Sequence, residues 1–301
     1  TLEVLVKHVI KYTILSPYQV MKVREIGAKE WEDVSLADFD TTQPYVCPLA
    51  SGGSIIIFFY DSHLAHEVAF KGLLHNGDYF AKTVLSKFKE TSEVERIVSI
   101  ATDGETYGHH HKYGEMALAY FVDYIDQCAD AKLINYSEYL SLVTPMYEVK
   151  IVENSAWSCA HGIERWRDDC GCRLNVSKPS SQKWRLNLRA ALDWLRDQCC
   201  EFYERRMKSY SLDPWTLRNE SIELQLDASP ARIKAFFSKR GIKNIADQQS
   251  ILTLLEMQKF TTFMYTSCGW FFDDIGGIEA RQILAYAAKV IEIVYEVERT
   301  D

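Results

Sequence analysis

The sequence predicts an α/β fold in the first part of the chain and a helical domain in the second part. Continuous apolar runs alternate with stretches of helical spacing through the first half. Such alternation is typical of a parallel sheet covered by helices. After the polar stretch 172–182, apolar residues recur only at helical spacing. We therefore expect two domains, covering residues 1–176 and 177–301.

The expected elements of the first domain follow in order along the chain. Leu2, Leu5 and Val9 recur at helical spacing and predict a helix at the start. Buried strands are expected at 12–17, 52–61 and 96–104, weaker strands at 133–140 and 147–154, and helices at 63–74, 77–88 and 113–128. The working residues of such a sheet lie beyond the carboxyl ends of its strands. Asp61 and Asp103 both fall at such ends.

The second domain is expected to consist of helices. Residues 184–206 carry one apolar stripe at helical spacing, which is typical of an amphipathic helix. Asp213 and Pro214 predict a helix start, because Asp is a favoured N-cap and Pro is favoured at the first helical position. Two further helical stretches are expected at 250–272 and 277–298.

Composition narrows the classes of function and the cellular compartment. The net charge of -8 argues against nucleic acid as a partner, because phosphate binding needs clustered Lys and Arg. No apolar run approaches the roughly 20 residues that span a bilayer, so we expect no membrane insertion. Eight cysteines in 301 residues are too few for a disulfide scaffold. Together with the lack of a signal-peptide pattern, this favours a cytoplasmic protein.

The stretch "ATDGETYGHHHKYGE", residues 101–115, concentrates titratable side chains directly after an expected strand. Alternation along an extended chain places Asp103 and Glu105 on the same side. Paired carboxylates in different environments can supply both an acid and a base. A simpler interpretation is that the Asp and His residues cap the following helix in solvent.

A metal site is a second interpretation of the same stretch. Three consecutive histidines cannot all ligate one ion, because neighbouring side chains point in different directions. One of them, His109, could share an ion with Asp103. This would make the protein a metal-dependent carbohydrate hydrolase or deacetylase.

The stretch "NSAWSCAHGIERWRDDCGC", residues 154–172, contains a second group of possible ligands. Cys159, His161, Cys170 and Cys172 are the residue types that a structural zinc ion uses, although their spacing differs from the common zinc fingers. Packed thiols in a reduced protein are the alternative. Trp157 and His161 could instead line a carbohydrate pocket, since indole stacks on sugar faces and imidazole bonds hydroxyls.

A third group, "YTSCGWFFDD" at 265–274, combines aromatic and acidic residues. Phe271 and Phe272 are expected in the core at a helix end. Trp270 and Asp274 could belong to the core or could close over a carbohydrate site.

These residues resemble those of a known family. "ATDGETYGHHH" looks like the fourth signature motif of glycoside hydrolase family 57, filled here by Asp103, Gly104, Glu105, Tyr107, Gly108 and His109. "NSAWSCAHG" resembles the fifth motif of a poorly characterised branch of that family. The second half, including "LDPWTLRNESIEL", is similar to an uncharacterised helical domain found in the same branch. The resemblance covers almost the whole chain.

The resemblance implies a fold, a mechanism and a set of site residues. The fold would be the later part of an incomplete (β/α)7 barrel followed by helices. The family comprises retaining enzymes of α-glucans: amylases, 4-α-glucanotransferases and branching enzymes. Asp103 would be the general acid/base, and no cofactor would be needed. The residues expected to bind an oligo- or polysaccharide are Glu105, His109, Trp157, His161, Asp61, Gln19 and Trp270.

The sequence departs from the family at the nucleophile. The family uses a Glu in a Trp-Leu-Pro-Glu type motif, which does not occur here, and the His-x-His-Gln-Pro type motif is absent too. Glu3 is the nearest Glu in sequence, but it lies in a helical pattern and receives no such role. We therefore expect the chain to begin just after its nucleophile, to need the N-terminal part of the same protein and to be inactive alone. A non-catalytic carbohydrate-binding module is a further alternative.

Overall fold

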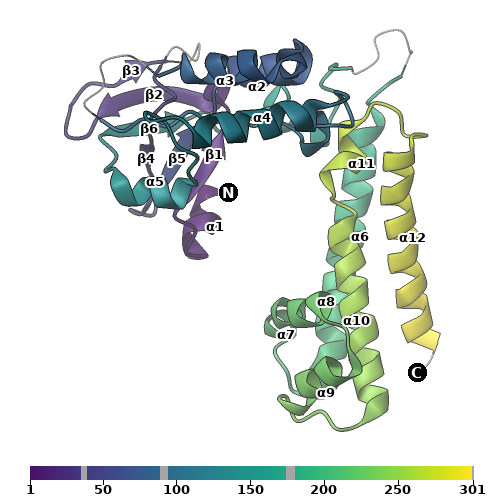
Figure 1. Ribbon diagram of the computed structural model, residues 1–301. Coiled ribbons are helices and arrows are strands. Elements are labelled where there is room, and N and C mark those ends of the chain that lie inside the picture. Colours follow the sequence, from purple (N-terminus) through teal and green to yellow (C-terminus); the bar gives the residue numbers. More distant parts are fainter. Residues whose placement is uncertain (35–38, 89–93, 174–179, 300–301) are drawn as a thin grey trace. The chain divides into compact units, whose positions relative to one another are not determined.

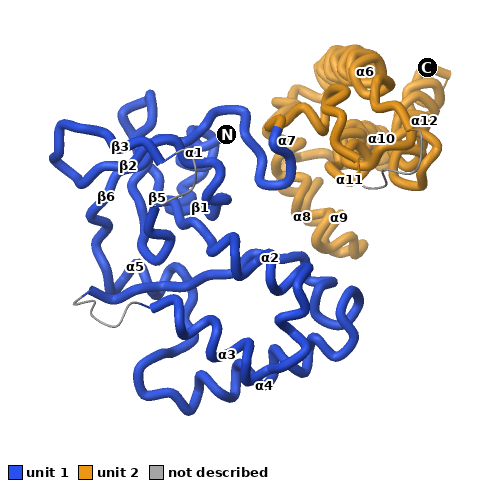
Figure 2. The backbone as a smooth tube through the Cα atoms, turned by 90° about the horizontal axis from the view of Figure 1, so that it is seen from above, with its two compact units in different colours: residues 1–160 blue, residues 161–301 orange. Residues whose placement is uncertain are grey.

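The computed structural model describes residues 1–34, 39–88, 94–173 and 180–299. These residues form two compact units, Thr1–Ala160 and His161–Asp301, which Figure 2 draws in different colours. The domain boundary predicted at residues 176 and 177 lies outside the described residues. The first unit combines a sheet with helices and the second is helical, as expected.

A six-stranded mixed sheet forms the first unit. Its strand order is β1-β5-β4-β6-β2-β3. The strands are β1 (Tyr12–Leu15), β2 (Val20–Glu25), β3 (Glu32–Asp33), β4 (Tyr45–Pro48), β5 (Ser54–Phe59) and β6 (Tyr147–Ile151). β1 is parallel to β5 and β4 is parallel to β6, whereas β4–β5, β2–β6 and β2–β3 are antiparallel pairs. The prediction of a purely parallel sheet was therefore wrong.

The turn between β4 and β5 shows why the sheet is mixed. Gly52 has a φ of +85°, a left-handed conformation that favours glycine. Its N–H donates to the Leu49 carbonyl at 3.0 Å, and the Leu49 N–H donates to the Gly53 carbonyl at 2.9 Å. The two glycines therefore close a hairpin instead of simply leading into β5.

Helices and short 3-10 turns cover the rest of this unit. They are α1 (Leu2–Lys7), α2 (Ser62–Phe70), α3 (Gly77–Leu85), α4 (Gly114–Asp126) and α5 (Tyr136–Leu142), with 3-10 turns η1 (Pro17–Gln19), η2 (Leu73–His75) and η3 (Gly104–Thr106). Figure 1 shows α2, α3 and α4 grouped together, and their apolar side chains share one core. All of the predicted helices of this unit are confirmed, and α5 is an additional one.

Two of the predicted strands are wrong. The stretch 133–140 contains the start of α5, whose N-cap Asn135 accepts a hydrogen bond from the Glu138 N–H at 2.9 Å. The stretch 96–104 is extended but is not a strand of the sheet. It is held by single hydrogen bonds, such as the one from the Asp61 N–H to the Ser99 carbonyl at 2.8 Å.

Strand β5 separates two cores of the first unit. Ile55, Ile57 and Phe59 pack into the core formed with β2, β4 and β6. Phe58 packs into a different cluster, with Ile97 among its buried members. This alternation is the period of two that a strand imposes on its side chains. β5 ends at Phe59, and Asp61 lies two residues beyond this end.

The second unit is formed by helices. They are α6 (Trp184–Met207), α7 (Pro214–Glu220), α8 (Ile222–Leu226), α9 (Pro230–Ser238), α10 (Ile245–Phe263), α11 (Ser267–Phe271) and α12 (Ile278–Arg299), with 3-10 turns η4 (Gly162–Trp166) and η5 (Lys208–Tyr210). Figure 1 shows α6, α10 and α12 side by side. The predicted cap is confirmed, since Asp213 accepts the Thr216 N–H at 2.7 Å. Across the described part of the chain, no helix is both long and apolar enough to cross a membrane.

Candidate active site

Two chain segments that carry predicted site residues pass close to the carboxyl end of β5. β1 and β5 are parallel and pair Leu15 with Phe59, so the segments that follow both strands begin at the same edge. The Asp61 N–H donates to the Ser99 carbonyl at 2.8 Å. The chain that leads to Asp103 therefore passes directly beside the end of β5. Asp61 therefore follows a strand end, as predicted, whereas the stretch before Asp103 is extended but is not a strand of the sheet.

Asp103 is exposed at the start of η3. Its backbone is extended and its side chain makes no hydrogen bond to the turn that it precedes. The helix that follows, α4, has Tyr113 as its N-cap. The interpretation of Asp103 as a helix cap is therefore not supported. Glu105 and His109 are exposed as well, so the three side chains of the expected site all meet solvent.

Buried neighbours hold the loop that carries these exposed groups. Thr106 is buried, and Tyr107 packs against the core of α2, α3 and α4. The Tyr107 hydroxyl accepts a hydrogen bond from the Thr102 hydroxyl at 3.3 Å. The His111 Nε2 donates to the Ala69 carbonyl at 2.8 Å. Gly108, whose φ is +120°, donates its N–H to the His111 carbonyl at 3.2 Å.

The three histidines of the loop do not converge. The N–H groups of His109 and His110 both donate to the Glu105 carbonyl, at 3.1 and 2.8 Å. Their rings lie in solvent, whereas His111 turns inward to Ala69. Among the described residues, Asp103 and His109 belong to no group of three or more ligands able to share an ion.

Asp61 and Gln19 make structural hydrogen bonds. Asp61 caps α2 by accepting the Leu64 N–H at 2.8 Å, and its second oxygen lies 3.2 Å from the Lys87 Nζ. Gln19 accepts the Ser16 N–H through Oε1 at 3.0 Å and donates from Nε2 to the Ser155 hydroxyl at 3.2 Å. Both side chains therefore already stabilise the segments that follow β1 and β5.

The two predicted tryptophans differ in exposure. Trp157, in the first unit, is 63% exposed. Trp270, in the second unit, is 1% exposed, donates its indole N–H to the Met264 carbonyl at 2.9 Å and stacks on Trp184. Its packing corrects the prediction that Trp270 contacts substrate, because a ring buried on all sides has no face for a sugar. Asp274 is exposed and accepts the Gly276 N–H at 2.8 Å, which is a turn contact.

The predicted cysteine and histidine ligands lie together. The possible ligand atoms of Cys159, His161, Cys170 and Cys172 all lie within 4.8 Å of one another. All eight cysteines of the chain are among the described residues and are reduced thiols. The cluster borders buried Arg185, whose Nη1 lies 3.9 Å from the Cys170 Sγ. Burial lowers the pKa of the Arg185 guanidinium, and the contact with Cys170 opposes that shift.

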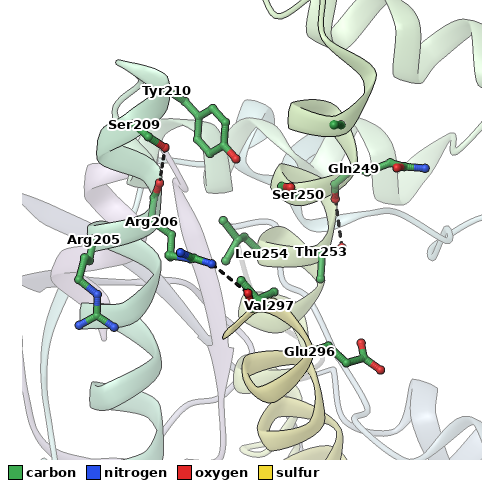
Figure 3. Close-up of a pocket in the computed structure, with 11 residues that line it drawn as sticks. Arg205, Arg206, Ser209, Tyr210, Gln249, Ser250, Thr253, Leu254, Glu296 and Val297 are labelled. Atoms are coloured by element: carbon green, nitrogen blue, oxygen red, sulfur yellow. Dashed lines mark hydrogen bonds between the residues drawn. The ribbon is translucent and has the colours of Figure 1, made fainter. Parts of the chain in front are cut away.

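A separate cavity of about 630 Å³ lies among α6, α10 and α12 of the second unit. Figure 3 shows its lining, which includes Arg205, Arg206, Gln249, Thr253 and Glu296. The guanidinium of Arg206 donates to the Val297 carbonyl at 3.0 Å and so ties α6 to α12. The cavity contains none of the predicted site residues. The sequence did not indicate it, because its lining comes from three helices far apart along the chain.

Comparisons with known proteins separate the two halves of the chain. Glycosyl hydrolase family 57 matches residues 2–152, and a domain of unknown function, DUF3536, matches residues 181–301. No curated protein matches the chain. The crystal structure of a novel exo-type maltose-forming amylase from Pyrococcus sp. ST04 is similar in fold, with 15% identity and a TM-score of 0.70.

That likeness covers 96% of this chain and 52% of the amylase, so the chain spans about half the length of that protein. At this identity the likeness shows a shared fold. The family match extends over half of the chain and includes the loop that carries Asp103. The chain belongs to glycosyl hydrolase family 57.

Proposed function

We propose that this chain carries the acid/base half of a retaining α-glucan hydrolase or transglycosylase, with Asp103 as the general acid/base. The family membership supports a glycosidase. The observation that carries the assignment to Asp103 is its exposure on a loop that buried Thr106 and the hydrogen bond of His111 to Ala69 hold in place. A catalytic carboxyl must reach the glycosidic oxygen, and a fixed backbone keeps it in place.

The proposed reaction has two steps. The protonated carboxyl of Asp103 gives its proton to the leaving oxygen as the bond to the anomeric carbon breaks and a second carboxylate bonds to that carbon. Asp103, now ionised, takes a proton from water or from an acceptor sugar, whose oxygen displaces the second carboxylate. In a retaining site the two carboxyl groups lie about 5 to 5.5 Å apart.

The second carboxylate is not assigned to a residue of this chain. The Trp-Leu-Pro-Glu type motif of the nucleophile does not occur in residues 1–301. We therefore propose that these residues do not complete the site by themselves. The sheet of the first unit would be the later part of an incomplete (β/α)7 barrel, to which the remaining part of the protein contributes the nucleophile.

The surrounding residues have proposed roles in binding and positioning. Glu105 and His109 are exposed on the same loop as Asp103 and would bond sugar hydroxyls. The largely exposed ring of Trp157 would stack on a sugar face. Asp61 and Gln19 would act as positioning residues through the caps that they form. The glycosidase chemistry uses no ion, so any metal at the cysteine and histidine cluster would be structural.

The test is hydrolysis of α-glucans by the full-length protein. Asp103→Asn is expected to lower kcat/KM by roughly 10²- to 10⁴-fold, the usual contribution of a general acid/base. The thermal midpoint should not change, because the Asp103 side chain is exposed and makes no cap hydrogen bond. Asp126→Asn, at an exposed position at the end of α4, is the matched control and should retain full activity.

Three results would contradict the proposal. Equal activity of Asp103→Asn and the control variant would remove Asp103 from the mechanism. Loss of turnover on metal removal, restored by adding the ion back, would favour the metal-dependent hydrolase. Binding of α-glucan without any turnover by the full-length protein would favour the non-catalytic binding module.

A further inference from the structure

The side chains of Cys159, His161, Cys170 and Cys172 lie close enough together to share one tetrahedral metal ion. Zinc bonds of about 2.3 Å to sulfur and about 2.0 Å to nitrogen place ligand atoms roughly 3.5 to 3.8 Å apart. The His161 Nδ1 and the Cys172 Sγ lie 3.3 Å apart, and all four ligand atoms lie within 4.8 Å of one another. The alternative interpretation, packed thiols in a reduced protein, does not explain why the His161 Nδ1 lies beside the three sulfur atoms.

The backbone between the last two cysteines fits this arrangement. Gly171 separates Cys170 from Cys172 and has a φ of +75°, a left-handed conformation that other residues adopt only with strain. No atom lies within 4 Å of the position that a Cβ of Gly171 would take. A side chain would fit at position 171, so glycine is needed there only because of the left-handed backbone conformation. The turn allows both thiols to reach the same centre.

The buried charges beside the cluster call for a negative partner. Arg165 and Arg185 are buried, and Asp273 is the one buried carboxylate among the described residues. The Arg165 Nη2 and the Arg185 Nε are buried without a hydrogen-bond partner in the described part of the chain. These three groups leave one net positive charge, which is costly in a buried environment unless it is compensated.

A zinc ion with three thiolates and one neutral imidazole carries one net negative charge. This charge would balance the excess positive charge of the two arginines and Asp273. The Arg185 Nη1 lies 3.9 Å from the Cys170 Sγ, where it would stabilise a thiolate. Without the ion, the Cys170 thiol donates to the buried Gln182 Oε1 at 3.6 Å, and it would give up this hydrogen bond on losing its proton to bind zinc.

We propose that Cys159, His161, Cys170 and Cys172 bind one structural Zn²⁺ ion. On binding, the three thiols release their protons to solvent and His161 coordinates through Nδ1. Four protein ligands leave no open position for water or substrate, so the site is closed and structural. Its role is to hold the segment 159–172 in place. The proposal is independent of the glycosidase assignment.

The experiment measures zinc in the full-length protein purified without a histidine tag and without added metal. About one zinc per chain is expected, and strong thiol reagents should release it. Replacing the ion with Co²⁺ should give thiolate-to-cobalt charge transfer and the strong visible absorption of tetrahedral cobalt. This measurement needs no variant, so it remains decisive even if a ligand variant does not fold.

Two ligand variants and one control test the assignment to these residues. Cys170→Ser and Cys172→Ser should each lower the zinc content by about fivefold or more, since a closed site needs all four ligands. Cys268→Ser should retain the full zinc content, because Cys268 is exposed in α11 and lies outside the cluster. A folded protein without zinc, full zinc in both ligand variants, or a disulfide between Cys170 and Cys172 would overturn the proposal.

Discussion

The loop 101–111 and the segment 159–172 are both rich in titratable side chains, but their side chains are arranged in opposite ways. In the loop, Asp103, Glu105 and His109 are exposed while the residues between and after them are buried or bonded. In the segment 159–172, the ligand atoms turn toward one another. Buried Arg185 lies 3.9 Å from one of them, the Cys170 Sγ, and 3.9 Å from the buried carboxylate of Asp273.

The difference matches what the two proposed roles require. A substrate arrives from solvent, so its partners must be exposed and their backbone must be fixed. An ion that belongs to the fold is held from within, so its ligands converge and neighbouring charges balance it. Residue composition alone does not separate these two cases, because histidine, cysteine and acidic residues occur in both kinds of site.

Removal of the buried arginine should have the largest effect on stability. Arg185 is fully buried and donates to the carbonyls of Phe271 and Phe272 at 3.0 Å each. Arg185→Met should lower the free energy of unfolding by about 3 to 5 kcal/mol, because Asp273 and the cluster lose their positive partner. Denaturant unfolding of the full-length protein measures this change.

The matched control is Arg232→Met. Arg232 is half-exposed and lies 3.7 Å from Asp227, so its loss should cost less than about 1 kcal/mol. Equal effects of the two variants would mean that the buried charge at Arg185 does not stabilise the segment 159–172.

Buried thiols in the two cores should make the stability of the fold decrease at alkaline pH. Burial raises the pKa of Cys47 and of Cys199 from 9.0 to about 11. The folded protein therefore favours the protonated thiols, and their stabilisation is complete below pH 9 and is lost as the pH rises towards 11. The expected loss is roughly 2 to 3 kcal/mol for each thiol.

Denaturant unfolding measured at several values between about pH 8 and about pH 11 tests this expectation. In Cys199→Ala the alkaline loss of stability should become smaller than in the unmodified protein. An unchanged pH dependence would show that the Cys199 thiol does not contribute to it.

The consecutive histidines of the loop provide a smaller test. His111→Ala removes the hydrogen bond to the Ala69 carbonyl, and it should lower the free energy of unfolding by about 1 to 2 kcal/mol. His110→Ala changes an exposed ring and should have an effect below about 0.5 kcal/mol. Denaturant unfolding of both variants compares them directly. If the two losses were equal, His111 would not anchor the loop.

Apolar runs predicted β1, β5 and β6, and helical spacing predicted α1, α2, α3 and α4. β5 follows from "SIIIFF", and α4 follows from its helical spacing. β2, β3 and β4 were missed. The residues of β2 and β3 are largely polar or half-exposed, and β4 has only four residues, too few for a continuous apolar run. The segment with α5 was taken for a strand because its Ile and Tyr residues also suit strands, whereas the Asn135 cap starts a helix.

The exposed residues of the candidate site could be predicted from the sequence, whereas the contacts that hold its loop in place could not. The local motif was enough to indicate Asp103, without knowledge of any long-range contact. The His111–Ala69 hydrogen bond joins positions 42 residues apart, and single-sequence patterns do not show such pairs. Trp270 was misjudged for the same reason, because the packing of Trp184 against it becomes visible only in three dimensions.

The most direct test of the account compares two substrates of the full-length Asp103→Asn protein. An α-glucoside with an activated leaving group needs no proton for bond cleavage, whereas a maltooligosaccharide does. The account predicts a loss of roughly 10³-fold for the oligosaccharide and a much smaller loss for cleavage of the activated substrate. Added azide should restore turnover of the activated substrate and give a glycosyl azide of retained configuration. Equal losses for both substrates, with no effect of azide, would contradict the role of Asp103 as acid/base.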